Sequence, residues 1–424
     1  MPRVRSQFGG TCNEEGVTSG RYRPVASCPG AITVSVLVVP FAAAMSEHPV
    51  TAHAVGEVAG QVLERVGERP DLALVFVTPP HAGALEDTVA AVDALLHPLV
   101  LLGCAAESVA GPHREVEQTA ADTLFAARTG PLLPLALDVV PAGEGTATLS
   151  GWPSEVPFEP QALVLLADPY SFPAEEVLGV LEKTHRHLPV IGGMASAGRG
   201  PGGNRLALGS SVRASGAVGA LLGPGIDVET VVSQGCRPFG HPLVVTKAEA
   251  NVIFELAGRP ALERLVSQAH ETLDEEELEL LESGGLHLGR VIDEHRDQFG
   301  PGDFLVRNVM GADRRSGAIA VGDVVPVGTT VQFHLRDART ADEELHTVLR
   351  GRQADAALLF TCNGRGTRLF EAPDHDVAVL TEELGRIAVA GFFAAGELGP
   401  VGGHNFLHGF TASVALLRDP VATA

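Results

Sequence analysis

The sequence predicts an α/β protein built from repeated β-α-β units, with mixed sheets arranged in two lobes. Two observations carry this prediction. A short apolar run, a segment with helical spacing and a second apolar run occur three times in the same order. In the first two copies, the same number of residues separates the start of the first run from the proline before the second. A strand, a helix and a strand joined by short loops pair in parallel through a right-handed crossover, so the helices cover a sheet.

The first copy starts at Leu72–Val77, a continuous apolar run that indicates a buried strand. Leu85–Leu96 has the spacing of a helix, and Leu99–Leu102 is the second strand. The alternating stretch Val116–Ala127 indicates further, antiparallel strands, which make the sheet mixed.

The other two copies keep this order. The second copy comprises, in chain order, Leu163–Leu166, Ala174–Thr184, Val190–Ser196 and a hairpin that ends at Ala214–Leu222. The third copy comprises Ala356–Phe360, Val377–Leu384, Ala388–Glu397 and Gly409–Leu417. We expect the first two copies to form one lobe.

The segment between the second and third copies differs from the repeats. Residues Asp303–Asp337 alternate and contain glycine turns, which predicts a β-meander, and Ala338–Leu349 is a helix with Asp337 as its N-cap. Pro260–Glu282 is an amphipathic, Glu-rich helical stretch that marks the boundary between lobes. We expect the meander and the third copy to form the second lobe, with a ligand cleft between the lobes.

Residues 1–44 are predicted to be an N-terminal extension, disordered or misassigned as coding sequence. The apolar run Ala31–Ala44, preceded by Arg3 and Arg5, loosely resembles a signal peptide, but a polar stretch separates the charges from the run. Translation from Met45 is the alternative. The run is too short to span a bilayer and contains a proline, so no membrane role is indicated.

The amino-acid composition excludes some classes of protein function. The chain has 424 residues with 30 Lys and Arg against 52 Asp and Glu, a formal net charge of −22, which excludes general nucleic-acid binding. A locally basic pocket remains compatible with this charge. Five scattered cysteines, with no pair at zinc-ligand spacing, indicate a reducing cytoplasm rather than a disulfide framework.

Glycines at strand ends are candidates for backbone contact with a ligand. Gly192 and Gly193 follow the second strand of the second copy, where ligands collect in β-α-β units. Tight packing is the alternative role. Neither nucleotide-binding glycine motif occurs, so no nucleotide or other cofactor is predicted.

Cys362 follows a buried strand directly, as the nucleophile of α/β enzymes does. A thiol-dependent hydrolase or acyltransferase would need a base, and His375, His404 and His408 are the candidates, although no spacing links them to Cys362. A buried, unreactive thiol is the alternative, and we expect no enzyme. His404 and His408 are four residues apart, but the surrounding glycines indicate a loop and argue against a metal site.

A set of polar residues suits a zwitterion such as an amino acid. Arginines would bind its carboxylate and Glu397 its ammonium group. The predicted ligand-binding residues, besides the two glycines, are Arg307, Asn308, Arg336, Cys362, Asn363, Arg365, Glu397, Asn405 and His408. Arg307 and Arg336 are equally suited to be ion-pair partners of nearby acids.

Several stretches resemble the FIST family over nearly the whole chain. They are GCAAESVAG with REVE, VIGGMASAG, VSQGCRPFG, GDFLVRNVMG, VQFHLRDA, LLFTCNGRG and FFAAGELGPVGGHNFLHGFTA. The resemblance implies a FIST N-terminal domain over residues 45–258 and a FIST C-terminal domain over residues 259–424.

The resemblance also implies a function: an intracellular signal-transduction sensor that binds a small ligand, with amino acids as the candidate class. No output domain is visible within the sequence, so we expect action through an unknown downstream signalling protein. A thiol enzyme using Cys362 and a non-catalytic adaptor are the alternatives.

Overall fold

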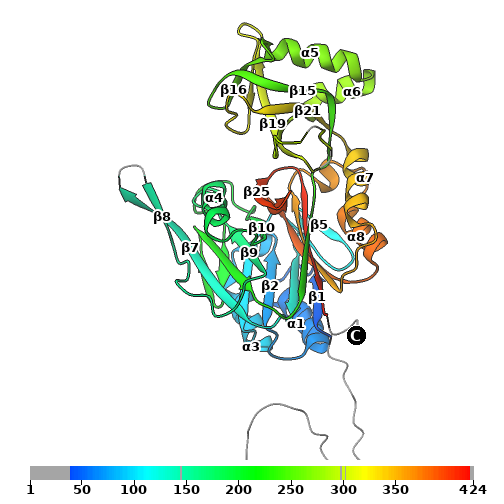
Figure 1. Ribbon diagram of the computed structural model, residues 1–424. Coiled ribbons are helices and arrows are strands. Elements are labelled where there is room, and N and C mark those ends of the chain that lie inside the picture. The colour runs from blue at the N-terminus through cyan, green and yellow to red at the C-terminus, as the bar shows by residue number, and fades with distance from the viewer. Residues whose placement is uncertain (1–38, 144–145, 297, 301, 421–424) are drawn as a thin grey trace, which may run out of the picture. The chain divides into compact units, whose positions relative to one another are not determined.

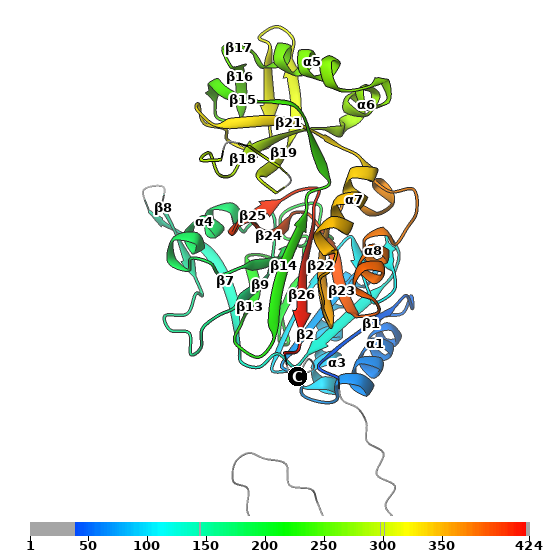
Figure 2. The same cartoon turned by 45° about the vertical axis from the view of Figure 1, so that its right-hand side comes forward.

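The computed structural model describes residues 39–143, 146–296, 298–300 and 302–420 (Figures 1 and 2). Residues 236–336 form a barrel. Residues 39–233 and 338–420 form what we call the body. The predicted roles of Arg3, Arg5 and residues 1–38 in general lie outside the described residues.

The α/β fold and its three repeats are confirmed. Each repeat has a parallel strand pair with a helix between the strands. In chain order the repeats are β2 (Leu72–Val77), α3 (Leu85–Leu96) and β3 (Val100–Ala105); β9 (Ala162–Ala167), α4 (Ala174–Thr184) and β10 (Val190–Met194); and β22 (Ala356–Cys362), α8 (His375–Leu384) and β23 (Ala388–Ala394).

In each repeat, an antiparallel strand pairs with the first strand and extends the sheet on that side. These strands are β6 (Asp122–Ala127), β13 (Ala217–Leu222) and β26 (Ala412–Arg418). Their outer neighbours are β1 (Phe41–Ser46), β7 (Leu132–Gly143), which also pairs with β8 (Thr146–Ser150), and β14 (Asp227–Ser233). The three sheets are therefore built to one plan.

The hairpin after each repeat pairs with a different repeat. After β3, hairpin β4 (Ser108–Ala110) and β5 (Glu115–Glu117) extends the sheet of the third repeat at β23. After β10, hairpin β11 (Leu206–Leu208) and β12 (Ser211–Arg213) extends that of the first at β3. After β23, hairpin β24 (Glu397–Val401) and β25 (His404–His408) extends that of the second at β10. The repeats thus exchange hairpins in a ring.

One apolar core joins the three repeats. Phe76 of β2 packs against Phe360 and Phe392 of the third repeat, with ring centroids 6.4 and 5.0 Å away. Val164 and Ile191 of the second repeat belong to the same buried cluster. The expectation that the third repeat shares a lobe with the meander is therefore wrong, because its strands pair and pack with the first two repeats.

The predicted meander is part of a closed antiparallel barrel. Its strands, in order around the barrel, are β15 (Cys236–Glu249), β21 (Thr330–Arg336), β18 (Leu286–Val291), β19 (Phe304–Asp313), β20 (Ala318–Val321) and β16 (Val252–Leu256), and β16 pairs back with β15. The short β17 (Arg259–Pro260) extends β16. β21 lies beside β18 rather than β20, so the segment is not a simple meander.

Helices lie around both parts of the fold (Figure 2). Asp337 caps α7 (Ala338–Leu349) through a 2.7 Å bond from the Thr340 amide, as predicted. The boundary stretch is split into α5 (Ala261–Thr272) and α6 (Glu275–Leu280), and α5 packs on the barrel. The remaining helices are α1 (Thr51–Val66) and α2 (Pro79–Ala82). Within the described ranges, no helix is long and apolar enough to cross a membrane.

The N-terminal boundary needs correction. Strand β1 starts at Phe41 and pairs along its length with β6, so the last four residues of the predicted extension 1–44 belong to the fold. Translation from Met45 would remove Phe41 to Ala44, all of which are buried. The physical reason is that the apolar run fills the outer position of the first sheet.

Gly192 is required for close strand packing, and we predict that Gly192→Ala destabilises the chain. Its φ is +149°, and a Cβ atom would lie 1.8 Å from the carbonyl oxygen of Leu165 on β9. We expect the free energy of unfolding in urea to fall by at least about 2 kcal/mol. The control is Gly179→Ala on α4, where a Cβ meets nothing within 4 Å. The free energy of unfolding of this control variant should rise by up to about 1 kcal/mol. Equal effects at both positions would contradict the packing role.

Candidate functional site

The loop after β22 is the centre of the candidate site. β22 ends at Cys362, and Asn363, Gly364 and Arg365 lead into a short 3₁₀ turn at Gly366–Arg368. The loop lies at the carboxyl end of the parallel pair β22 and β23. This is the edge at which ligands collect in β-α-β units.

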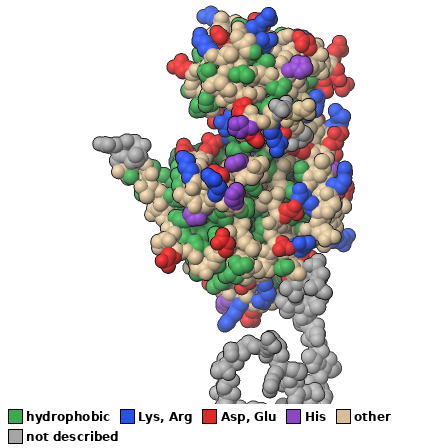
Figure 3. Space-filling model, in the orientation of Figure 1, with side chains coloured by type: hydrophobic (Ala, Val, Ile, Leu, Met, Phe, Trp, Pro, Cys, Tyr) green, Lys and Arg blue, Asp and Glu red, His purple; other side chains and the backbone are tan. Residues whose placement is uncertain are grey.

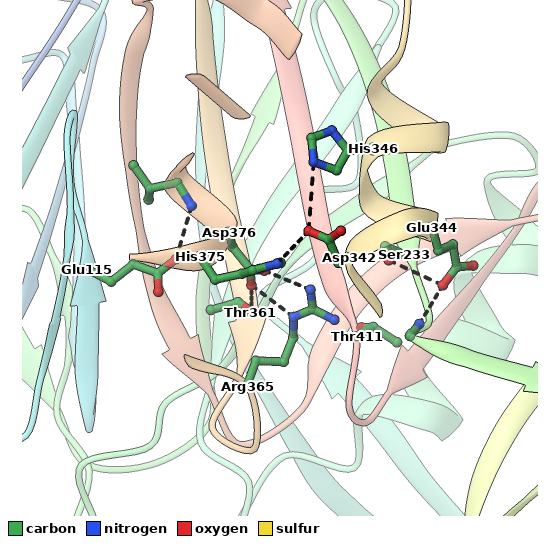
Figure 4. A network of polar contacts seen from close by, with 12 residues as sticks. Glu115, Ser233, Asp342, Glu344, His346, Thr361, Arg365, His375, Asp376 and Thr411 are labelled. Carbon is green, nitrogen blue, oxygen red and sulfur yellow. Dashed lines mark hydrogen bonds and ion pairs between the residues drawn. The ribbon is translucent and has the colours of Figure 1, made fainter. Parts of the chain in front are cut away.

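Arg365 is anchored by a buried ion pair (Figure 4). Its Nε and Nη2 donate to the two carboxylate oxygens of Asp376 at 2.9 and 2.7 Å, and neither side chain is exposed. Thr361 Oγ1 donates to the same carboxylate at 2.6 Å. Burial alone would raise the pKa of Asp376, but the Arg365 charge and these hydrogen bonds hold it below its ordinary value. Arg365 is therefore fixed in position.

His375 extends this network toward the surface. The His375 ring lies between Asp376 and Asp342, with nitrogen to oxygen distances of 2.9 Å on both sides (Figure 4). His375 also stacks on Phe370, with 3.3 Å between ring centroids, and the Arg365 guanidinium lies 5.2 Å from the Phe370 ring centroid. His375, a predicted candidate base, is thus engaged by two carboxylates.

Acids of the first repeat bind this loop of the third. Glu115 accepts the Val377 amide at 3.1 Å, and Glu117 accepts the amide and hydroxyl of Thr367 at 2.9 and 2.8 Å. Glu107 pairs with Arg368. Because hairpin β4 and β5 extends the sheet of the third repeat, the sequences AAES and REVE reach residues that follow the sequence CNGRG and the start of α8.

Arg336 lies where the barrel meets the body. It is the last residue of β21, and its Nη2 donates to the carbonyl oxygen of Gly364 at 2.8 Å. Its guanidinium lies 4.8 Å from the ring centroid of Phe410. Phe410 has a φ of +69°, an unfavourable backbone conformation for a residue with a side chain. Such strain is typical of functional sites.

Glu397 is a buried acid beside this arginine. One of its carboxyl oxygens accepts the amide and the hydroxyl of Thr411 at 3.1 and 2.9 Å. Burial raises the pKa of Glu397 to about 8, although the Thr411 bonds and the Cys362 thiol act to lower it. Glu397 therefore keeps its proton in most molecules at neutral pH.

Several buried polar atoms of this region have no hydrogen-bond partner among the described residues. Two belong to guanidinium groups, one is an amide oxygen and one is a carboxyl oxygen: Arg336 Nε, Arg365 Nη1, Asn363 Oδ1 and Glu397 Oε1. A buried polar atom is normally paired, so each of these calls for a ligand or an ordered water molecule. We call Arg336, Cys362, Asn363, Arg365 and Glu397 the junction site.

The Cys362 thiol is held between the Gly364 amide and the Glu397 carboxyl group. Burial and the neighbouring Glu397 carboxyl group raise the pKa of Cys362 to about 12. Its sulfur accepts the Gly364 amide at 3.3 Å. Of the other proposed bases, His404 contacts Glu182, and His408 Nε2 donates to the carbonyl oxygen of Gly399 at 2.9 Å.

The remaining predicted residues lie outside the junction site. Arg307 of β19 donates to the Leu407 carbonyl and pairs with Glu175 of α4, and Asn308 is exposed on β19. The Asn405 side chain bonds the Val190 amide and the Leu188 carbonyl. The predicted single pocket is thus divided between the junction site and a separate cleft.

The backbone pairing relates three further predicted residues. Gly193 of β10 lies opposite Glu397, which lies opposite His408 of β25. Burial lowers the pKa of His408 to about 4, so its ring is neutral at physiological pH. Gly193 allows close packing on Ala394, since a Cβ atom would come within 2.9 Å of the Ala394 side chain.

The sequence prediction missed four residues around the site. His287 of β18 stacks edge-on against Phe410 at 4.6 Å, and Glu344 accepts the Gly235 amide. Asp376 and Thr411 are the other two. Asp376 could have been identified as the acid directly before the predicted helix Val377–Leu384, whereas His287 and Glu344 have no comparable signal.

A cleft of about 450 Å³ lies between α4, β25, β18 and β19. Of the predicted residues, Arg307 and Asn405 line it. On the face drawn in Figure 3, acidic and basic side chains are interspersed rather than gathered into a basic surface. Over the described parts of the chain, no group of three or more His, Cys, Asp or Glu side chains is arranged to hold a metal ion.

We predict that Glu397 makes stability fall with rising pH. The folded chain holds this proton up to pH of about 8, whereas the ordinary value is 4.5, so folding is favoured at low pH and the gain is lost as pH rises through this window. Relative to Glu397→Gln, the wild-type free energy of unfolding should fall by at most about 1.4 kcal/mol per pH unit. Urea titrations at pH 5 to 9 measure it.

The control for this measurement is Glu279→Gln, which changes an exposed carboxylate on α6. It should keep the wild-type pH dependence. If Glu397→Gln also follows the wild-type curve in parallel, Glu397 is ionised in the folded chain.

Comparison with known proteins places these features in a family. A FIST N domain model matches residues 71–259, and a FIST C domain model matches residues 261–400. An uncharacterized protein of Mycobacterium tuberculosis strain H37Rv is 43% identical over 382 residues, 88% of this chain and 98% of that protein. An uncharacterized protein of Mycobacterium bovis is 42% identical over 382 residues, 88% of this chain and 97% of that protein.

FIST domains are associated with sensing in signal transduction. The two domain models together cover most of the chain, as do the relatives, and the residues of the junction site fall within the matched ranges. The chain therefore belongs to the FIST family, with a FIST N domain followed by a FIST C domain.

Proposed function

We propose that this chain is a cytoplasmic sensor that binds a small zwitterion, an amino acid, at the junction site. The observation that carries the proposal is that two neighbouring side chains, Arg336 and Glu397, each keep one buried polar atom, Nε and Oε1, without a hydrogen-bond partner among the described residues. The free thiols of Cys104, Cys236 and Cys362 support a reducing compartment.

The two groups complement the two ends of an amino acid. The Arg336 guanidinium binds the carboxylate through the Nε atom that has no partner among the described residues. Oε1 of Glu397 accepts the ammonium group. Because the pKa of Glu397 is about 8, an ammonium ligand favours the ionised form and binding releases a proton.

Part of the junction site reaches the surface, although Arg365 and Glu397 are fully buried. Cys362, Asn363, Gly364, Arg336 and Phe410 are each half-buried rather than fully enclosed. A Cβ atom at Gly364 would have its nearest neighbours at 3.6 to 3.7 Å, so the glycine leaves room beside the arginine. Bulky side chains on the ligand would have to extend toward solvent.

The position of the site suits a sensor. Arg336 belongs to the barrel, whereas Cys362 and Glu397 belong to the body. The chain passes between the two parts at 233–236 and 336–338, and Arg336 lies at the second passage. A ligand held by Arg336 and Glu397 bridges the two parts and favours one arrangement of them, which a downstream protein can read.

We predict that amino acids stabilise the chain in a thermal-shift panel, and that molecules with only an amine or only a carboxylate do so weakly. Ligand at a hundred times its dissociation constant adds about 2.7 kcal/mol to the folded state. Arg336→Lys should weaken binding at least about tenfold, because lysine lacks the planar guanidinium group that binds a carboxylate through two N–H groups. Binding should strengthen from pH 6 to pH 8 as Glu397 is more readily ionised.

The matched control is Arg418→Lys, which changes an arginine that pairs with Asp227 on the far edge of the third sheet. It should bind as the wild type does. No stabilisation by any zwitterion in the panel would contradict the proposal and favour an adaptor without a small ligand.

We also propose that the chain has no enzymatic activity based on Cys362. The elevated pKa of its thiol, about 12, supports this, because the thiolate is the reactive form. The three histidines considered as bases are engaged by other groups.

We predict that iodoacetamide modifies Cys362 in the folded chain at least about tenfold more slowly than free cysteine at pH 7.5, because little thiolate forms. Mass spectrometry of the Cys362 peptide measures the rate separately from the other cysteines. The chain unfolded in urea is the control, and its Cys362 should react at the rate of free cysteine. Faster modification in the folded chain would instead support the thiol enzyme.

A further inference from the structure

The hairpin of β7 and β8 projects from the second sheet as a two-stranded ribbon (Figures 1 and 2). β7 pairs with β13 only as far as Leu137, and from Asp138 onward its partner is β8. We call Asp138–Gly143 together with Thr146–Ser150 the ribbon. β8 is an outer strand of the sheet, so no described strand lies on its far side. Two strands alone are marginally stable in water, so a third strand would stabilise the ribbon.

The pairing with β7 fixes which backbone groups of β8 point outward. Pro141 has no amide hydrogen and lies opposite Ala147, so this is a pair without ladder hydrogen bonds. Val139 and Leu149 form the next such pair. The amide and carbonyl groups of Ala147 and Leu149 are therefore directed away from β7. Within the described ranges, none of these four outward groups has a hydrogen-bond partner.

The two edges of the ribbon differ in their ability to pair with another strand. On β7 the outward groups belong to Val139 and Pro141, and the proline offers no donor. On β8 there is neither a proline nor a charged side chain from Ala147 to Ser150. Proteins normally protect an exposed edge with charges, prolines or bulges. Three other outer strands carry such charges: Glu115 and Glu117 on β5, Arg213 on β12, and Asp227 and Glu229 on β14.

A second copy of this chain is the occupant that the charges favour. The formal net charge of −22 makes copies repel each other, so a contact between copies needs an uncharged surface. Between Val139 and Ser150 the sequence has one charged residue, Glu144, which lies outside the described residues. Because the ribbon projects, two ribbons can pair while the acidic bodies stay apart, which weakens their screened repulsion. The second copy also supplies an equally unprotected strand by symmetry.

The outward groups of β8 are in register for a symmetric pair. When two β8 strands run antiparallel about a two-fold axis at Thr148, Ala147 of one copy lies opposite Leu149 of the other. Both residues have outward groups, so they exchange two hydrogen bonds, and the axis generates the same two bonds again. Thr148 then lies opposite Thr148 of the other copy in a pair without ladder bonds, where the Cα atoms are about 4.5 Å apart and the side chains are close.

We propose that β8 is a dimerisation edge, at which the ribbons of two copies join through antiparallel β8 strands into one four-stranded sheet. Both copies use the same edge, so assembly closes at the dimer. The contact between two short strands is smaller than a standard interface, so the dimer forms only at elevated concentration. The proposal does not require the amino-acid ligand, because β8 lies at the opposite edge of the second sheet from β24, which carries Glu397.

Sedimentation equilibrium of the full chain between about 1 and 500 µM should show a reversible equilibrium of monomer and dimer. Thr148→Lys places like charges opposite each other at the axis and should weaken dimerisation at least about tenfold, although it reduces the net negative charge. Val140→Lys is the matched control, because Val140 is exposed and lies opposite Thr148 on β7, one strand farther from the axis. This control should weaken dimerisation less than about twofold.

A mixture of charge variants separates symmetric pairing from other effects of substitution. Thr148→Glu should also weaken dimerisation, whereas mixing it with Thr148→Lys should give a heterodimer, because opposite charges then face each other at the axis. With one variant ¹⁵N-labelled, native mass spectrometry identifies the heterodimer. The proposal is overturned if the wild type stays monomeric or forms larger assemblies, if Thr148→Lys dimerises as Val140→Lys does, or if the mixture forms no heterodimer.

Discussion

The exchange of hairpins among the three repeats is the constraint on which the structure depends. Each parallel pair is completed at one side by a hairpin that follows a different repeat, so no repeat completes its sheet alone. The exchange places Glu107 and Glu117 of the first repeat on the loop after β22 of the third, and Glu115 on the first turn of α8. It also places Glu397, at the start of an exchanged strand, beside Gly193 of the second. The junction site is therefore a product of all three repeats.

The buried pair of Arg365 and Asp376 gives this site its rigidity. Two charges removed from water are costly unless they are paired and hydrogen-bonded, and removing one partner typically costs about 3 to 5 kcal/mol. Here Thr361 and His375 complete the carboxylate's bonds, so Arg365 is a fixed element rather than a mobile ligand-binding arm. Arg336 differs because it is half-buried and binds a backbone carbonyl. The proposed contact with a ligand therefore falls to Arg336, whereas Arg365 supports the loop.

Periodicity in the sequence predicted the elements better than their arrangement. The bounds of Leu72–Val77 and Leu85–Leu96 follow from apolar patterning, and the Asp337 cap follows from local chemistry. Strand exchange depends on long-range pairing, which local patterns do not encode, so the third repeat was assigned to the wrong lobe. The site was predicted in part for the same reason. Strand ends identified Cys362 and Glu397, whereas the contact of Arg307 with α4 depends on how the barrel meets the body.

Strand β26 is among the last elements of the chain, and it lies between β14 and β22 in the third sheet. A chain leaving the ribosome has therefore made the first two repeats long before the strand that joins β14 to the body is available. Loop closure over such distances is slow, and exposed strand edges in the interval favour misassembly. The strands of the barrel all lie within one continuous segment, so its folding does not depend on strands that are synthesised much later. During synthesis the barrel is thus able to fold before the third sheet is complete.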